Sequence, residues 1–233
     1  MRLILQYALW VVGLGIQVLV IHALLREHYK KFPLVFVYVL TSLLTTVIEV
    51  SAFTFAQTGA RSMQRSWRLY YWIDDAVLQA LIYSVVISLI YKAMMRAEAR
   101  TATRRWLVAG AFLIFLALFW MHHGPGKQLS SWMTLISRDL SFVAVVLDLL
   151  LWSTLIASRK KDHQLLMLSG GLGIQFTGSA IGQSVRQLSQ GPMARNAALA
   201  GSVLVVLSNL ICLYVWWQAF RKPDSPEAPN PGG

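Results

Sequence analysis

The sequence predicts an all-α integral membrane protein, a polytopic transmembrane bundle of seven helices. Its 233 residues are 56% hydrophobic and only 13% charged, and their mean hydropathy is +0.55. A soluble domain is about 45–50% apolar and about 25% charged, so the excess apolar surface here must face something other than water. The apolar residues also come in runs of about 20, the length that a helix needs to cross a bilayer.

Seven apolar stretches follow one another along the chain. They cover residues 3–25, 33–56, 70–94, 105–121, 132–157, 164–185 and 197–220. Each is predicted to be helical, because backbone amides in hydrocarbon must be hydrogen-bonded within their own segment or within a closed barrel, and a barrel would show shorter alternating runs.

The individual stretches differ in detail. The first has the charge and apolar run of a signal peptide but no clean small-residue cleavage site, so we expect it to be retained. Pro33 suits the first turn of the second stretch, where its missing N–H costs nothing. The fourth stretch is the shortest and the sixth is the least apolar. We predict one transmembrane domain over residues 1–222 and a disordered cytoplasmic tail over 223–233, which is rich in proline.

The basic residues predict the orientation. Thirteen of the 21 Lys and Arg fall on the side of the C-terminus and eight on the side of the N-terminus. The positive-inside bias therefore predicts that the N-terminus lies outside and the C-terminus in the cytoplasm. The net charge of +11 lies in short clusters between apolar stretches. Such clusters meet anionic lipid headgroups, so we expect the lipid bilayer and not nucleic acid as the partner.

Polar residues inside the predicted spans are the candidate ligand-binding residues, because a charge there costs about 2.5–3.5 kcal/mol and normally faces the bundle interior. They are Glu49, Asp74, Asp75, Gln79, Asp148, Gln175 and Arg186. Helical spacing places Glu49 on one face with Tyr38, Ser42 and Thr45. Asp148 is the strongest candidate, since it lies deepest and has no evident cationic neighbour in the sequence.

Two interpretations of these residues stay open. If their faces converge, they form a polar cavity that opens to the outside. Alternatively, they form only a structural network, in which each interhelical hydrogen bond contributes about 0.6 kcal/mol.

The sixth stretch is rich in glycine. Its Gly178-x-x-x-Gly182 motif predicts close packing against a neighbouring helix, and a helix break that exposes backbone for ion binding is the alternative. The nine tryptophans lie mostly near the ends of the predicted helices, which is typical of an aromatic belt at the membrane interface.

The sequence lacks the residues that several known activities require. Residues 197–220 contain neither the lysine that a retinal protein needs nor the histidine pair of seven-helix zinc hydrolases. Nucleophile elbows, Walker loops and dinucleotide fingerprints are also absent from the sequence. We expect no cofactor and no metal site, and these absences argue against an enzyme.

The segment Tyr71-Trp72-Ile73-Asp74-Asp75, together with the basic inner loops, resembles a family of uncharacterised bacterial seven-helix integral membrane proteins. It is more distantly similar to the seven-helix sensor region of some histidine kinases, with Asp where that motif has Glu. The resemblance implies location in the bacterial inner (plasma) membrane and a sensor-like role. A cytoplasmic or membrane protein partner would relay the signal.

Three functions follow from these observations. The first is a sensor or receptor-like module with an outward-facing polar cavity. The second is a small ion-coupled transporter that uses Asp148 and the outer carboxylates. The third is an intramembrane enzyme that acts on lipid.

Overall fold

The computed structural model describes residues 2–57, 64–96, 109–110, 113, 116–117, 120, 129–157, 162–188 and 194–221, and all regular structure in these ranges is helical. Its long helices are α1 (Arg2–Ala23), α2 (Pro33–Gln57), α3 (Gln64–Arg96), α5 (Leu129–Ala157), α6 (His163–Leu188) and α7 (Ala194–Arg221), and a short π-helix η1 (Leu24–His28) extends α1. The all-α prediction is confirmed. The predicted helix at 105–121 falls mostly outside the described residues, and the tail at 223–233 falls wholly outside them.

Five stretches of these helices are long and apolar enough to cross a membrane. They are Tyr7–Arg26, Pro33–Ala52, Val77–Met95, His163–Arg186 and Ala197–Arg221. Large apolar side chains on the outer surface of the bundle, such as Val11 and Val146, are more than half exposed. In a soluble protein this surface would be costly, whereas lipid tails accept it. The chain is therefore a multi-pass membrane protein.

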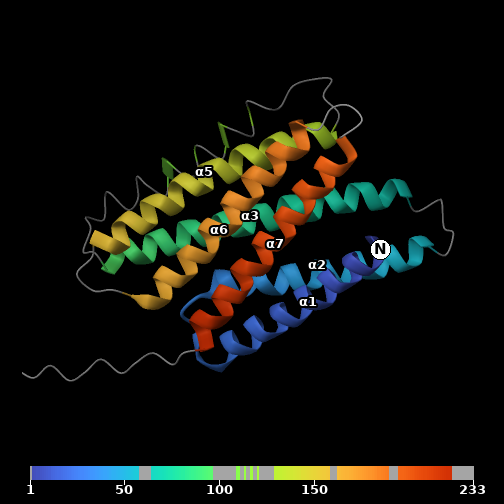
Figure 1. Ribbon diagram of the computed structural model, residues 1–233. Coiled ribbons are helices and arrows are strands. Elements are labelled where there is room, and N and C mark those ends of the chain that lie inside the picture. Colours follow the sequence, from blue (N-terminus) through green and yellow to red (C-terminus); the bar gives the residue numbers. More distant parts are fainter. Residues whose placement is uncertain are drawn as a thin grey trace, which may run out of the picture.

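Each of the six long helices in the described ranges packs mainly against two neighbours, and α3 also contacts α6 across the bundle. Following the contacts, α1 lies against α2, α2 against α3, α3 against α5, α5 against α6, α6 against α7, and α7 returns to α1. In Figure 1 the blue α1 and α2 lie along one edge of the bundle, the yellow-green α5 lies along the other, and α6 and α7 run between them. The most extensive of these contacts joins α6 to α7.

Glycines bring α6 and α7 together. A Cβ atom added to Gly178 would overlap Ser208 of α7, and one added to Gly182 would lie 2.7 Å from the backbone oxygen of Gly201. Gly201 faces back in the same way, because its own Cβ would lie 2.6 Å from the oxygen of Gly182. The predicted close packing at Gly178-x-x-x-Gly182 is thus confirmed.

We expect Gly182→Ala to lower the free energy of unfolding by about 1–3 kcal/mol, because its methyl group would meet the backbone of α7, which cannot move aside. Thermal unfolding of the detergent-purified protein measures the loss. Gly15→Ala is the matched control, since nothing lies within 4 Å of its added Cβ. The control should unfold no earlier than the wild type, because alanine is the better helix former. Equal midpoints for the two variants would contradict the close contact.

Candidate functional site

A polar face of α2 turns into the bundle. Tyr38, Ser42 and Thr45 are each less than 10% exposed, and Glu49 at the next turn is half-buried. This confirms the shared face predicted from their spacing. The face points towards α1, α6 and α7, because Ser42 bonds to a residue of α1 and Tyr38 contacts residues of α6 and α7.

The centre of the interior is a junction of three helices. Gln175 of α6 donates to the hydroxyl of Tyr38 at 3.0 Å, and the ring of Tyr38 packs edge-on against Trp216 of α7 with centroids 5.8 Å apart. The indole N–H of Trp216 donates to the backbone oxygen of Leu168 at 3.1 Å. Trp216 is fully buried, so the interpretation of the tryptophans as an interfacial belt is wrong for this residue. Space for it comes from Gly171, whose Cβ would lie 2.9 Å from the indole nitrogen.

Three amide oxygens in the interior have no hydrogen-bond partner within the described part of the chain. They are Oε1 of Gln17, Oε1 of Gln175 and Oδ1 of Asn209, and all three are inaccessible to solvent. The Nε2 atom of Gln17 donates to Ser42 at 2.9 Å and to Thr46 at 3.4 Å. A buried acceptor without a partner costs about 1–3 kcal/mol.

The remaining predicted ligand-binding residues lie on three different helices, α2, α3 and α6. Arg186 donates from Nε and Nη2 to the hydroxyl of Ser202 on α7, at 3.1 and 2.7 Å. Asp74 and Gln79 of α3 are half-buried, as is Glu49, and the side chain of Asp75 lies outside the described residues. That all the predicted site residues share one outward cavity stays a prediction.

Asp148 is buried between α5 and α6, at 4% exposed. One carboxylate oxygen, Oδ1, accepts a hydrogen bond from the hydroxyl of Ser169 at 2.7 Å. The other, Oδ2, lies only 2.7 Å from the point where a Cβ of residue 173 would be. Glycine at position 173 is therefore what gives this carboxylate its place.

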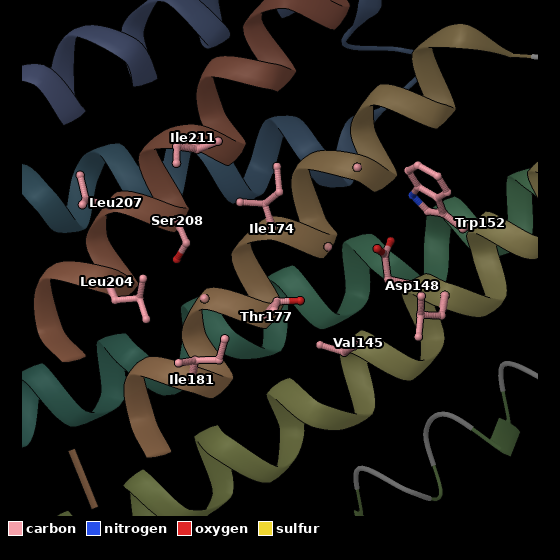
Figure 2. A pocket seen from close by; sticks show the side chains of 14 residues that line it. Val145, Asp148, Trp152, Ile174, Thr177, Ile181, Leu204, Leu207, Ser208 and Ile211 are labelled. Atoms are coloured by element: carbon pink, nitrogen blue, oxygen red, sulfur yellow. The ribbon is translucent and has the colours of Figure 1, made fainter. Parts of the chain in front are cut away.

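Asp148 also lines a groove between α5, α6 and α7 with a volume of about 670 Å³ (Figure 2). Exposed apolar residues, including Leu149, Ile181 and Ile211, form its walls, so it opens on the lipid-facing side. In Figure 2 Asp148 and Trp152 lie at the α5 side and Leu204 and Leu207 at the α7 side, with α6 as the floor. Besides the carboxylate, the polar side-chain groups of its lining residues are the hydroxyls of Thr177 and Ser208 and the indole N–H of Trp152.

Sequence reasoning identified Asp148 and Gln175 but passed over three contributors: Gln17, Ser169 and Gly173. Gln17 offers a signal that could have been used, because it is the only polar side chain in an apolar run from Val11 to Ile21. Ser169 and Gly173 offered none, since their roles depend on how α5 meets α6.

Within the described ranges, no group of three His, Cys, Asp or Glu side chains is placed to hold a metal ion. Comparison of the chain with protein-family models, with curated proteins and with solved structures finds no match.

Two tyrosines test whether the interior hydrogen bond stabilises the bundle. Tyr38→Phe should lower the free energy of unfolding by about 1–3 kcal/mol, because the Gln175 amide is then left buried without its acceptor. Tyr214→Phe is the matched control. It removes a bond of the same kind and length, in which Gln218 donates to the Tyr214 hydroxyl at 3.0 Å, but at an exposed position. We expect this control to change the free energy of unfolding little. Thermal unfolding measures both. An equal loss in the two variants would argue against the buried junction.

Proposed function

We propose that this protein is a receptor-like membrane protein that binds an amphiphile from the bilayer in the groove between α5, α6 and α7. The observation that carries the proposal is the buried carboxylate of Asp148 in a groove that is otherwise apolar and open to lipid. Ligand sites typically combine apolar walls with a few placed polar groups. A carboxylate at membrane depth is also, by default, a functional group.

The polar group of the ligand follows from the surroundings of Asp148. A carboxylate has two oxygens and about four lone-pair sites, and Ser169 occupies one of them. The oxygens of this carboxyl group accept hydrogen bonds, so a ligand that donates one suits it best. A protonated amine or a hydroxyl at the end of an apolar body provides the donor and fits the apolar walls. An ionised acidic headgroup has no hydrogen to donate.

The contacts around the groove support a receptor-like role. An amphiphile in the groove touches α5, α6 and α7 at once, and α6 is in backbone contact with α7 at Gly182 and Gly201. A displacement of α6 is therefore passed to α7. A cytoplasmic or membrane protein partner reads that displacement from the cytoplasmic side, and the chain resides in a bacterial inner membrane.

Photoreactive C18 amphiphiles with amine, alcohol or acid headgroups test the ligand class. The amine and alcohol should label groove peptides of α5, α6 and α7 at concentrations about tenfold below the acid, because a hydrogen bond to a charged group contributes about 1.5–3 kcal/mol. Labelling is mapped by mass spectrometry on the full chain in liposomes.

Asp148→Asn should raise the amine concentration needed by about tenfold, again through the loss of a charge-assisted hydrogen bond. Asp139→Asn is the matched control, because Asp139 is a carboxylate of the same helix that does not line the groove. Equal labelling by amine and acid, or equal effects of the two substitutions, would refute the proposal.

The proposed orientation has seven spans, with the N-terminus outside. Single cysteines introduced in a Cys212→Ala background test it through an impermeant maleimide applied to intact cells. Cysteines at positions 60 and 128 should react, whereas those at positions 160 and 225 should be protected until the cells are opened. Reaction at 225 in intact cells would reverse the orientation.

A further inference from the structure

We propose that Arg186 binds a phosphate group between α6 and α7, at the end of the bundle where α6 ends and α7 begins. A phospholipid headgroup and free phosphate offer the same chemistry to this residue. The site is distinct from the lipid-facing groove, because Arg186 does not line the groove.

Contacts with α7 fix the position of the Arg186 side chain. Its Nε and Nη2 atoms both donate to the hydroxyl oxygen of Ser202, at 3.1 and 2.7 Å. Its stem lies close to Gly201, where an added Cβ would be 3.1 Å from the Cγ atom of Arg186. Glycine at position 201 therefore leaves room for the stem, and Ser202 supplies the acceptor that holds the guanidinium.

The charge of Arg186 is not neutralised by the residues that hold it. Its hydrogen bonds within the described part of the chain go to Ser202 and to Oε1 of Gln183, which are neutral. A positive charge at the end of a membrane span that is paired only with neutral groups favours an anion as its further partner.

The guanidinium keeps the edge that recognises phosphate. A guanidinium has five N–H groups, and Ser202 and Gln183 take one each from Nε, Nη1 and Nη2. One N–H on Nη1 and one on Nη2 remain. These two form the fork that binds two oxygens of one phosphate or carboxylate side by side.

Gln183 adds donors beside this fork. Its Oε1 lies 3.4 Å from Nη1 of Arg186, so its amide nitrogen, on the same carbon atom, is close to the guanidinium. The two amide hydrogens have no acceptor among the described residues. The Ser202 hydroxyl donates to the backbone oxygen of Ala198 and accepts twice from Arg186, so it is fully used. What the side chains offer a ligand is mainly hydrogen-bond donors, which suits an oxyanion.

The level of the site in the membrane favours phosphate over other oxyanions. The candidate span His163–Arg186 has 24 residues and ends at Arg186. Its helical length is about 36 Å, whereas the hydrocarbon core is about 30 Å thick. Arg186 therefore lies at the boundary between hydrocarbon and headgroups, where the phosphates of lipids are found. Its side chain is half-buried and so remains accessible from that boundary.

Thermal unfolding of the full chain in detergent tests the site, followed by intrinsic tryptophan fluorescence. The additives are dioleoylphosphatidylglycerol, dioleoylglycerol, which has the same acyl chains without the phosphate, and sodium phosphate against sodium chloride at equal ionic strength. We expect the phosphate lipid or inorganic phosphate to raise the midpoint by about 2–4 °C along a saturable curve, because a ligand that binds only the folded state stabilises it. The source that acts at the lower concentration is the preferred one.

Arg186→Gln should raise the half-saturation concentration by at least about tenfold, through the loss of charge-assisted hydrogen bonds. Arg221→Gln is the matched control and should leave it unchanged. It removes the same charge from the other end of α7, where Arg221 is exposed and stacks on the ring of Trp217 at 5.2 Å. No rise with either phosphate source, an equal rise with dioleoylglycerol, or equal effects of the two substitutions would overturn the proposal.

Gln183→Glu tests the same site without removing the arginine. The new carboxylate takes the place of Oε1 beside Nη1 and neutralises the guanidinium from within the chain. We expect this variant to unfold no earlier than the wild type in the absence of phosphate and to lose the phosphate-dependent rise. The variant therefore decides even if Arg186→Gln does not fold. An undiminished rise in Gln183→Glu would contradict binding at Arg186.

Discussion

The backbone contact between α6 and α7 is the constraint on which the rest of the structure depends. Between helices in lipid there is no hydrophobic driving force, so association rests on close packing and on polar contacts. At Gly182 and Gly201 each helix leaves no room for a side chain on the other. This fixes the rotation of α6 about its own axis. With that rotation set, Gly173 must face Asp148 on α5, and Gln175 must face Tyr38 on α2.

The interior treats its polar groups in two different ways. Asp148 of α5 accepts a hydrogen bond from Ser169 of α6, and the indole of Trp216 on α7 donates to the backbone of α6, so these groups hold the three helices together. The amides of Gln17 and Gln175 use their donors on α2 but keep their oxygens buried and unbonded.

Helical periodicity made part of this predictable. The shared face of Tyr38, Ser42 and Thr45, and the close packing at Gly178 and Gly182, follow from spacing within one helix, which is a local property. For Trp216 the prediction was wrong. Its position near a helix end predicts a place at the membrane interface, whereas the space left by Gly171 on α6 lets the indole be buried, and one helix's spacing does not reveal that space. The groove was beyond sequence reasoning for the same reason, since it depends on the relative rotation of three helices. Whether Glu49, Asp74 and Gln79 share a cavity likewise depends on how α2 and α3 face the other helices.

Helix α6 separates the groove from the junction at Tyr38, and its packing decides how the two are connected. Gly173 and Gln175 are two residues apart and so point about 160° apart, one to α5 and the other to α2. Rotation of α6 would drive neighbouring side chains into α7 and is sterically opposed. Where α5 meets α6 at this level, Ser169 donates a hydrogen bond to Asp148. On the proposed function, a ligand that adds a second donor at Asp148 acts on the same carboxylate, and a displacement of α6 that results is passed to α7 at Gly182 and Gly201.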